Sequence, residues 1–498
     1  QAGLQMLRAG GNAIDAIIAT AAVLTVVEPC SNGLGSDLFA LIWSPQDKAL
    51  HGLNSSGRSP QAWTPDTFKG MDSVPMRGWM SVSVPGAIAG WVALSKRYGK
   101  LPFADLLAPA IDIAERGYMV TPIIASQWAR AVPILQIQPG YAEHFMPHGR
   151  APLPGELFRN PAQAESLRLI AESEGESFYR GQLAARIVAH AKAHGGLMTG
   201  IDLAAHVADW VEPIRMGYRG YEVAEIPPNG QGIAALMALG MLDDFDLKAL
   251  GPNHPDYWHL SIEAMKLAFR DVHAQVADPE YMNVSASAML DRDFLKSRAK
   301  LIDLKRAQDF SPSAELRGGT VYLNAADESG LMVSLIQSNY YGFGSGVVVD
   351  GISLQNRAYG FTLDPAHPNC VAGGKRPFHT IIPGFILKDG QPVGPFGVMG
   401  GHMQPQGHMQ TAIRMIDFGE NPQAALDGPR FRVEQGLEVD LEPWAPAEVR
   451  AELAARGHKL KENKDSYMDF GSGQIIWKTA DGYITGSDPR RDGCAVGF

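Results

Sequence analysis

Hydrophobic residues occur along the chain in two kinds of run, long helical runs and short runs rich in β-branched and aromatic residues. The apolar run from Ala13 to Val27 predicts a buried helix that ends at Glu28-Pro29, because proline disfavours helical geometry in the residue before it. The run from Leu38 to Trp43 predicts a strand. Helical and strand-like runs alternate in both halves of the chain, and this pattern predicts the α/β class. Further helices are expected over residues 85–98, 104–116, 162–195, 257–276, 407–417 and 446–456, further strands over 380–387 and 474–477, an irregular loop over 54–81 and a surface elaboration over 121–165.

Two strand-like runs in the second half of the chain, 320–327 and 331–338, are separated by a turn signal. The first run is rich in strand formers and ends in an Asp-x-x-Gly turn pattern. The second run is apolar and β-branched enough to form a buried strand. If residues 328–330 form a three-residue hairpin loop, Asp327 faces Leu331 and the two runs pair in one defined register.

That register places the hydroxyl groups of Thr320 and Ser338 side by side, with Cβ atoms about 5 Å apart. Thr320 follows two flexible glycines, Gly318 and Gly319, and a polar segment over 300–317 of the kind that leads to a cleavage point. The pattern fits an ordinary strand entry. It also fits a nucleophile that cleavage of the chain would release.

Composition and charge narrow the class of protein. The chain has 498 residues and a mass of 53.7 kDa, which allows two or three domains or one large α/β core. With 45% hydrophobic and 19% charged residues it has the composition of a globular protein. A net charge of -10 and a pI near 5.8 argue against a nucleic-acid partner. The apolar run from Ala13 to Val27 is too short to span a bilayer.

The cysteines and histidines give no metal or disulfide pattern. Cys30, Cys370 and Cys494 are odd in number and far apart, so they predict neither a disulfide framework nor paired metal ligands. His190 and His194 lie four residues apart and could share a helix face, but the neighbouring residues offer no further zinc ligand. A solvated helix face is therefore favoured over a zinc site.

A set of short motifs follows a fixed order along the chain. They are residues 10–16 (GGNAIDA), 27–35 (VEPCSNGLG), 84–91 (VPGAIAGW), 263–269 (EAMKLAF), 277–279 (ADP), 343–346 (FGSG), 375–377 (KRP), 399–401 (MGG) and 487–490 (SDPR). In this order and spacing they resemble the motifs of the γ-glutamyltransferase family of N-terminal nucleophile hydrolases. The resemblance runs almost from end to end.

The resemblance implies a fold and a processing event. The family fold is a four-layer αββα sandwich, with helices outside two stacked antiparallel sheets. The resemblance also implies that the protein cuts its own chain between Gly319 and Thr320. Residues 1–319 then form a large-subunit segment and residues 320–498 a small-subunit segment that begins with the nucleophile, and both segments build one shared core.

Thr320 matches the family nucleophile by its spacing to Asp327. A threonine hydroxyl is a poor nucleophile without a base, and the α-amine of an N-terminal threonine, with a pKa near about 8, can serve as that base. Gly319 suits a cleavage site because glycine tolerates strained backbone angles and leaves its carbonyl open to attack. Val321 and Tyr322 depart from the family pattern, which commonly has a second threonine and a histidine there.

Three further positions match family groups that act on the nucleophile or on the oxyanion. Ser338 falls where the family has a hydroxyl that hydrogen-bonds the nucleophile; the alternative is an ordinary strand serine. Gly400 and Gly401 match the family's oxyanion hole, in which backbone N–H groups approach the developing charge, although by composition alone the pair would be a turn. The glycine-rich stretch 342–346 lacks the residues of a phosphate loop, so we expect an ordinary loop.

The substrate pocket departs furthest from the family pattern. Family members that bind glutamate hold its α-carboxylate with an arginine and its α-amine with an aspartate. Those positions align near Ser56 and with Gly360, and the paired serines that follow the Lys-Arg-Pro motif are replaced by His379 and Thr380. Only Arg58 lies close enough in the sequence to replace the missing arginine.

Arg357 enters the segment that the resemblance places against the pocket, and we expect Tyr340 and Asn356 to line the pocket as well. A gained guanidinium and a lost carboxylate favour a substrate that has a carboxylate and no α-amino group. On this interpretation no acid remains near Arg357 to hold an ammonium group. The alternative is that Arg357 forms a structural ion pair. The pattern resembles the oxamate amidohydrolase branch and the cephalosporin-acylase-like members more than the transpeptidases.

The leading hypothesis is a self-cleaving amidohydrolase that uses Thr320 to hydrolyse the amide of a small carboxylate-bearing acyl group such as oxamate. One alternative is a γ-glutamyl hydrolase or transpeptidase that acts on glutathione-like amides. The other is an uncleaved, catalytically silent relative that serves as a binding protein, although an intact Thr320 after Gly319 argues against it.

The partner that we expect is a small-molecule amide, with neither nucleic acid nor a membrane involved. We expect no cofactor and no metal, and a homodimer of processed heterodimers is an allowed assembly. A cytoplasmic location is expected. Because the chain begins with Gln1, inside a family motif, we also expect native N-terminal sequence to precede it.

Overall fold

The computed structural model describes residues 1–311, 319–462 and 469–498. The helices are α1 (Ala2–Arg8), α2 (Ala13–Val27), α3 (Ala87–Tyr98), α4 (Phe103–Arg116), α5 (Pro122–Leu135), α6 (Tyr141–Phe145), α7 (Pro161–Glu172), α8 (Glu176–Tyr179), α9 (Gln182–Ala193), α10 (Gly200–Ala204), α11 (Ile233–Leu242), α12 (Leu247–Leu250), α13 (Pro255–Gln275), α14 (Ala286–Met289), α15 (Arg292–Ala299), α16 (Met403–Ile416), α17 (Pro422–Asp427) and α18 (Ala447–Ala455). Short 3-10 turns add Pro65–Phe68, Trp79–Ser81, Pro279–Tyr281 and Arg357–Gly360.

Within the described residues the strands form two large sheets and three small ones. They are β1 (Asp37–Ser44), β2 (Ala49–Ser55), β3 (Tyr118–Met119), β4 (Leu157–Phe158), β5 (Asp209–Val211), β6 (Ile214–Tyr218), β7 (Tyr221–Glu225), β8 (Gly319–Ala326), β9 (Met332–Tyr340), β10 (Val348–Val349), β11 (Ile352–Ser353), β12 (Gly384–Lys388), β13 (Gln391–Met399), β14 (Phe431–Val433), β15 (Glu438–Leu441), β16 (Lys459–Glu462), β17 (Ser472–Lys478) and β18 (Tyr483–Ser487). The strand order is β5-β2-β1-β9-β8 in the first large sheet and β18-β17-β13-β12-β7-β6 in the second. Neighbouring strands run antiparallel throughout both large sheets.

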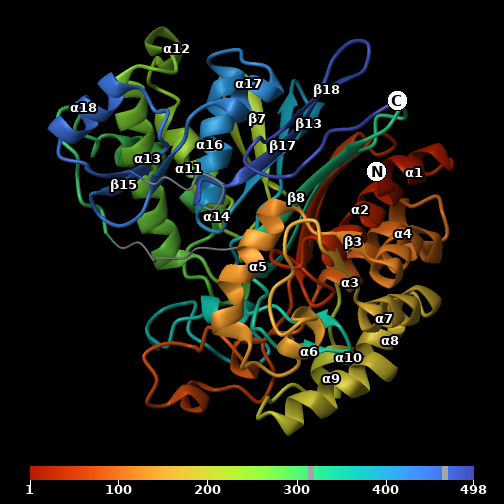
Figure 1. Ribbon diagram of the computed structural model, residues 1–498. Coiled ribbons are helices and arrows are strands. Elements are labelled where there is room, and N and C mark those ends of the chain that lie inside the picture. Colours follow the sequence, from red (N-terminus) through yellow and green to blue (C-terminus); the bar gives the residue numbers. More distant parts are fainter. Residues whose placement is uncertain (312–318, 463–468) are drawn as a thin grey trace.

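The two large sheets stack face to face and carry helices on their outer faces, as Figure 1 shows. Strand β1 illustrates the layering, because side chains alternate between the two faces of a strand. Leu38, Ala40 and Ile42 belong to the core that includes helix α2. Phe39 and Leu41 belong to the core between the sheets. A third core joins the second sheet to α11, α13 and α16, so the predicted four-layer αββα arrangement is confirmed.

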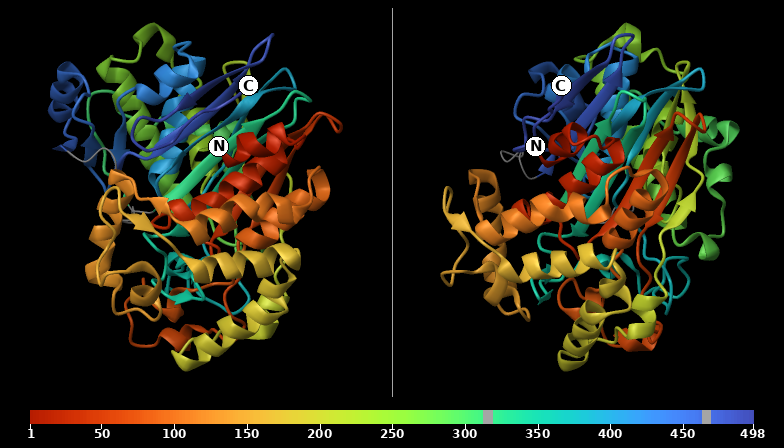
Figure 2. Two further views of the ribbon diagram at one scale, coloured as in Figure 1. Left: turned by 45° about the vertical axis from the view of Figure 1, so that its right-hand side comes forward. Right: turned by 90° about the vertical axis from the view of Figure 1, so that its right-hand side faces the viewer.

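Strands from both sides of the Gly319–Thr320 bond share each large sheet. In the first sheet β1, β2 and β5 precede this bond and are joined to β8 and β9. In the second sheet β6 and β7 precede it and the other four strands follow. The two ends of the chain also lie on one side of the molecule (Figure 2), where the Arg8 guanidinium lies 5.7 Å from the centre of the Phe498 ring. Cleavage of this one peptide bond would therefore leave both sheets held by hydrogen bonds between the two segments.

The region over 121–165 is more than the surface elaboration that we expected. It contains α5, α6 and β4, and it has an aromatic core of its own. Trp128 is fully buried, with ring centres 4.8 Å from Phe158 and 5.4 Å from Phe343. The region is thus packed against the loop that follows β9.

The expected strand over 380–387 begins only at Gly384. The backbone N–H groups of Ile381 and Ile382 bond to side chains, those of His379 and Gln404, instead of to a neighbouring strand. This segment forms part of the candidate site, which explains its departure from regular pairing.

The polar segment expected to be flexible over 300–317 is described only as far as residue 311, and 312–318 lie outside the described residues. Its described part is attached to the rest of the chain. The N–H of Ala307 donates to the carbonyl of Arg456 at 2.7 Å, and the N–H of Gln308 donates to the carboxylate of Glu263 at 3.1 Å. Residues 307 and 308 are therefore held by Arg456, which follows α18, and by α13, and they do not form a free linker.

None of the helices in the described ranges combines the length and the apolar character needed to cross a membrane.

The core between the sheets gives a prediction for stability. Leu41 is fully buried there, so Leu41→Ala should lower the free energy of unfolding by about 2–5 kcal/mol through lost burial and the cavity that remains. Chemical denaturation measures the change. Ile137→Ala is the control, because Ile137 is 81% exposed and its truncation should change stability little. Equal stability losses in the two variants would contradict the layered core.

Candidate active site

One end of the first sheet collects the groups of the candidate site. The strands alternate in direction, so the starts of β8 and β1 lie at the same end as the finishes of β9 and β2. Thr320 lies near the start of β8, Ser338 near the finish of β9, and Asp37 begins β1 opposite Ser338. The antiparallel order therefore brings together residues that are far apart in the sequence.

The predicted register of the β8–β9 hairpin is confirmed. The N–H of Asp327 bonds the carbonyl of Leu331 at 3.1 Å, and the pairs from Ala326–Met332 to Val321–Gln337 follow in step. The register shifts between Val321 and Gly319, so Thr320 lies at a local irregularity. Such irregularities re-aim side chains at the ends of strands and often occur beside active sites.

The hydroxyl of Ser338 has three polar neighbours. Its oxygen lies 3.0 Å from Oγ1 of Thr320, 2.8 Å from the carbonyl oxygen of Gly319 and 2.7 Å from the N–H of Tyr340. A carbonyl only accepts and an N–H only donates, and a serine has a single hydroxyl proton. Ser338 therefore donates to Gly319, and Thr320 donates its own proton to Ser338. The hydroxyl of Ser338 polarises the carbonyl that Thr320 would attack.

The expected oxyanion glycines form the turn between β13 and α16. Gly400 and Gly401 have φ values of 129° and 63°, a region that favours glycine. The side-chain amide of Gln231 ties this turn to the neighbouring loop by donating to the carbonyls of Gly401 at 2.9 Å and Thr380 at 2.6 Å. Strand β13 packs against β8, which carries Thr320. The use of this turn as an oxyanion hole stays a prediction.

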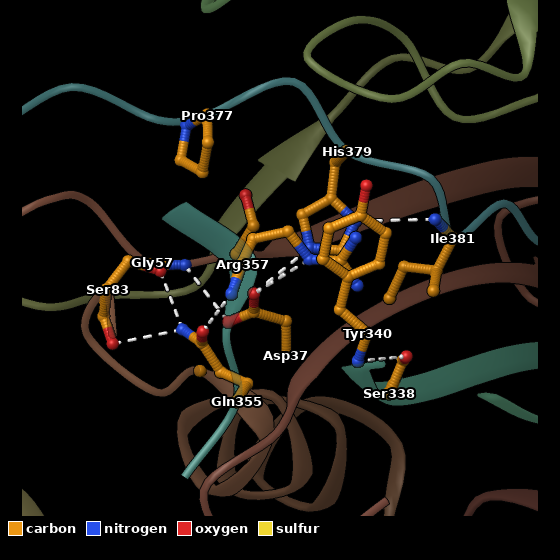
Figure 3. Close-up of polar contacts among 12 residues, drawn as sticks. Asp37, Gly57, Ser83, Ser338, Tyr340, Gln355, Arg357, Pro377, His379 and Ile381 are labelled. Atoms are coloured by element: carbon orange, nitrogen blue, oxygen red, sulfur yellow. Dashed lines mark hydrogen bonds and ion pairs between the residues drawn. The ribbon is translucent and has the colours of Figure 1, made fainter. Parts of the chain in front are cut away.

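Arg357 lies in a fully buried cluster near Ser338, the partner of Thr320 (Figure 3). Its guanidinium lies 4.0 Å from the centre of the Tyr340 ring, and its Nη1 donates to Oγ1 of Thr380 at 2.8 Å. Its Nε lies 3.7 Å from Oδ2 of Asp37, an ion pair too long for a hydrogen bond. Among the described residues, Nε and Nη2 have no hydrogen-bond partner.

The expectation that no acid remains near Arg357 is wrong. Asp37 is buried beside it, at the start of β1, and the ion pair that we held as the alternative for Arg357 is present. One signal for this acid is present in the sequence, a carboxylate directly before the apolar run that begins at Leu38. A charged residue there needs a partner, but the sequence alone does not say which one.

Neutral donors hold Asp37 in addition to Arg357. The N–H of Gly57 donates to its Oδ1 at 3.3 Å, and Nε2 of His379 lies 3.0 Å from its Oδ2. The N–H of Ile381 donates to Nδ1 of His379 at 3.4 Å, so we assign the proton of this imidazole to Nε2. His379 thus donates to Asp37 and does not face the substrate as a free base.

Burial sets the charges of this cluster. It raises the pKa of Asp37 to about 7, although the nearby Arg357 charge acts in the opposite direction. It lowers the pKa of Arg357 to about 10 and lowers the pKa of His379 well below its ordinary value. At neutral pH Arg357 is positive, His379 is neutral and Asp37 is close to its own midpoint.

Arg58 lies apart from the Arg357 cluster. Its Nη1 donates to Oδ2 of Asp278 at 3.0 Å and to the carbonyl of Gly374 at 3.1 Å. Its side chain lines a cavity of about 210 Å³, together with residues that include Asp202, His206, Asp209 and Arg376. Arg58 is thus engaged in an ion pair of its own, and a contact with the same substrate carboxylate as Arg357 stays a prediction.

The other expected pocket positions offer no charge. The side-chain amide of Asn356 accepts from the N–H of Tyr341 at 3.1 Å and donates to the carbonyl of Met76 at 2.8 Å, so both of its ends hold backbone. Ser56 is buried and donates to the side chain of Asn54 at 2.8 Å. Gly360 has no side chain. Neither of the last two can form the charged contacts that the family uses for glutamate.

A second buried polar cluster has the residue types of a metal site. Within the described ranges, His259, Glu263 and His458 bring one ligand atom each within 4.8 Å of one another. Nζ of Lys266 lies 2.8 Å from the carboxylate of Glu263 and 3.4 Å from Nδ1 of His458. Nε2 of His458 lies 2.8 Å from Nδ1 of His259. Nε2 of His259 lies 2.8 Å from the carbonyl oxygen of Asp303. This chain of donors satisfies every group without an ion, and the lysine charge opposes a cation.

Comparison with known proteins agrees with this geometry. The gamma-glutamyltranspeptidase family model matches residues 1–498. The glutathione hydrolase-like YwrD proenzyme of Bacillus subtilis (strain 168) is 37% identical, over 100% of this chain and 96% of the relative. The oxamate amidohydrolase proenzyme of Klebsiella pneumoniae is 36% identical, over 100% and 96%. The crystal structure of cephalosporin acylase from Bacillus halodurans has a TM-score of 0.95 and 50% identity, covering 99% of this chain and 93% of that one.

The layered fold and the family define an enzyme class, the amidohydrolases of the N-terminal nucleophile type. The chain belongs to the γ-glutamyltranspeptidase family.

The hydroxyl pair gives a prediction about rate. Ser338→Ala should slow self-cleavage by about 10- to 1000-fold and should lower kcat of the cleaved protein by a similar factor. The reason is the loss of the hydroxyl that polarises the Gly319 carbonyl and receives the Thr320 proton. A time course on denaturing gels measures cleavage. Ser334→Ala is the matched control, since Ser334 is a buried serine of the same strand whose hydroxyl bonds Tyr322 instead. Cleavage of Ser338→Ala at the wild-type rate would exclude this role.

Proposed function

We propose that this protein is a self-cleaving amidohydrolase that uses Thr320 as its N-terminal nucleophile to hydrolyse the amide of a small carboxylate-bearing acyl group. The observation that carries the cleavage step is the contact of Ser338 with both Thr320 and the carbonyl of Gly319. The observation that supports the substrate class is the buried guanidinium of Arg357, which keeps unused donors beside Tyr340 and Thr380.

Self-cleavage begins with attack of Oγ1 of Thr320 on the carbonyl carbon of Gly319. As the new C–O bond forms, the threonine proton passes to Ser338, and the proton of Ser338 passes to the carbonyl oxygen of Gly319. The C–N bond then breaks, the nitrogen of Thr320 takes the proton from the hydroxyl of the tetrahedral intermediate, and an ester joins Gly319 to Oγ1. Water hydrolyses this ester, which leaves a carboxylate on Gly319 and a free α-amine on Thr320.

Substrate hydrolysis repeats the chemistry with water as the second reactant. The α-amine of Thr320, with a pKa near about 8, takes the hydroxyl proton as Oγ1 attacks the amide carbonyl of the substrate. The backbone N–H groups of Gly400 and Gly401 are our candidates for stabilising the oxyanion. Ammonia or an amine leaves with the proton, and water then releases the acid from the ester.

The proposed substrate class follows from the charges around the site. Arg357 supplies a guanidinium, and the positions where the family holds glutamate carry Ser56 and Gly360. A small acid amide such as oxamate needs a cation and no ammonium-binding group, and a relative that is 36% identical is named an oxamate amidohydrolase.

Hydrolysis of γ-glutamyl amides is the second candidate. It is favoured by the carboxylate of Asp37 beside Arg357 and by a relative, 37% identical, that is named glutathione hydrolase-like. Against it, Asp37 already accepts hydrogen bonds from His379 and Gly57, so it offers little to a substrate ammonium.

The cleavage site gives a prediction about chain length. Purified protein should separate on a denaturing gel into two fragments, residues 1–319 and residues 320–498, which are 319 and 179 residues long. Thr320→Ala should remain one chain, because the attacking hydroxyl is absent, whereas Thr320→Ser keeps a hydroxyl and should still be cut. N-terminal sequencing of the small piece identifies the bond. A first residue other than Thr320, or an uncut wild-type protein, would refute the proposal and leave a binding protein as the better alternative.

The pocket gives a prediction about substrate preference. Loss of two charge-assisted contacts, each worth about 1.5–3 kcal/mol, should make kcat/KM for a γ-glutamyl anilide lower than for oxamate by a factor of about a hundred or more. Arg357→Ala should raise KM for oxamate by about 10- to 150-fold and leave self-cleavage intact, because processing involves no substrate carboxylate.

Ammonia release and anilide release measure the two reactions. Arg58→Ala is the comparison variant and should have a smaller effect, because Arg58 is engaged by Asp278. Melting temperatures establish that the variants are folded. Efficient hydrolysis of glutathione that is indifferent to Arg357→Ala would overturn the substrate class while leaving the cleavage mechanism in place.

A further inference from the structure

We propose that Asp37 is a specificity-determining positioning residue, which shares Arg357 with the carboxylate of the substrate and takes up a proton when that anion binds. The inference rests on the proposed function in one respect, that the acyl group bound beside Arg357 carries a carboxylate. Asp37 acts through Arg357 and His379, without a contact of its own to the reacting atoms.

The contacts of Arg357 leave hydrogen-bond donors available for a second anion. A guanidinium has five N–H donors, and in the part of the chain that the structure describes only Nη1 of this one makes a side-chain hydrogen bond, to Thr380. The contact with Asp37 is electrostatic, at 3.7 Å, and leaves both carboxylate oxygens of Asp37 bonded to other donors. In Figure 3 Asp37 and His379 lie beside the guanidinium, with Tyr340 packed on the same group.

The charge balance of the cluster makes Asp37 the group that must respond. The charges of ionised Asp37 and Arg357 cancel, and His379 is neutral. A second carboxylate would therefore leave a net negative charge in a fully buried site. An uncompensated buried charge is costly, and a proton on Asp37 removes it. Arg376, which also acts on Asp37, is already paired with Asp209 at 2.7 Å.

The remaining groups that face the pair do not supply the missing charge. The charged and titratable neighbours are Arg376, His379 and Tyr179 around Asp37, and Tyr340, Tyr341 and His402 around Arg357. Burial raises the pKa of Tyr179 and of Tyr340 and lowers the pKa of His402 well below its ordinary value. Tyr179, Tyr340 and the imidazole of His402 are therefore neutral near pH 7.

The proposal sets the direction of the pH dependence. When the pH lies below the pKa of Asp37, which is about 7, the carboxyl group already carries its proton, and an anion binds without further proton uptake. Above that pH the proton must come from solvent, so affinity for the anion falls by up to about tenfold for each pH unit. A bound anion raises the pKa of Asp37 further, and the loss ends where the pH passes that higher value. Neutral ligands should show none of this dependence from Asp37.

The test is the binding of oxalate, the acid that oxamate hydrolysis would release, to the processed enzyme. Calorimetric titrations between about pH 6 and about pH 8.5 compare the wild type with Asp37→Asn, which keeps the shape of the side chain and cannot ionise. The α-amine of Thr320 titrates in both proteins, so the difference between their pH profiles isolates Asp37. The wild-type affinity should fall by about tenfold or more above pH 7, and the Asp37→Asn profile should be flatter by that factor.

Glu225→Gln is the matched control. Glu225 is another fully buried carboxylate paired with a histidine, His408, at 2.6 Å, but it lies on β7 in the other sheet, and no arginine of the described residues pairs with it. Its variant should keep the wild-type pH slope. A slope lost in both variants would show that the removal of any buried acid has this effect, and it would overturn the assignment to Asp37.

A measurement on the wild type alone decides the case if Asp37→Asn does not fold. Infrared difference spectra at about pH 8 should show the band of a protonated carboxyl group appearing when oxalate binds, which an amine cannot produce. Bound oxalate without this band, or an unchanged slope in Asp37→Asn, would overturn the inference and leave the proposed function standing. Absence of oxalate binding at every pH, together with no ammonia from oxamate, would overturn the proposed substrate class and this inference with it.

Discussion

The single proton of the Ser338 hydroxyl is the constraint on which the candidate chemistry depends. The neighbours decide where this proton goes: the N–H of Tyr340 can only donate to Ser338, and the carbonyl of Gly319 can only accept from it. The direction of the remaining contact, from Thr320 to Ser338, follows from these two. The arrangement orients the threonine hydroxyl and polarises the neighbouring carbonyl without any charged group. It exists only because β8 and β9 pair in one register and lose that register at Gly319.

The stacked sheets explain how a chain can be cut at its own active site and keep its fold. Strand β8 begins at the bond in question, yet it is paired with β9 along its length and packed under β13. In both sheets strands from before the bond are paired with strands from after it, β1 with β9 in the first sheet and β7 with β12 in the second. The same antiparallel order gathers the ends of β8, β9, β1 and β2 at one end of the sheet. Stability and site geometry thus have a common origin in the pairing of strands that are distant in sequence.

The buried charges explain why substrate preference in this branch cannot be assigned from single positions. The gain of Arg357 and the uncharged residues Ser56 and Gly360 both point to a lone carboxylate as the group to be recognised. The structure adds Asp37, a buried carboxyl group that balances the charge of Arg357 when it is ionised. If an anion binds beside Arg357 as proposed, preference depends on how the cluster adjusts its protonation, because burial makes any uncompensated charge costly.

The sequence by itself determined what local rules govern. Proline ended α2, a short apolar run marked β1, and a three-residue turn fixed the partner of Thr320, because pairing in a hairpin is set by the loop. Only the tertiary structure decided the rest. Asp37 and His379 lie 342 positions apart in the sequence and are in contact. The side chain of Arg58, which we expected in the same pocket as Arg357, bonds to Asp278. Such contacts depend on how whole sheets stack and on which buried charge finds which partner, and no spacing along the chain records them.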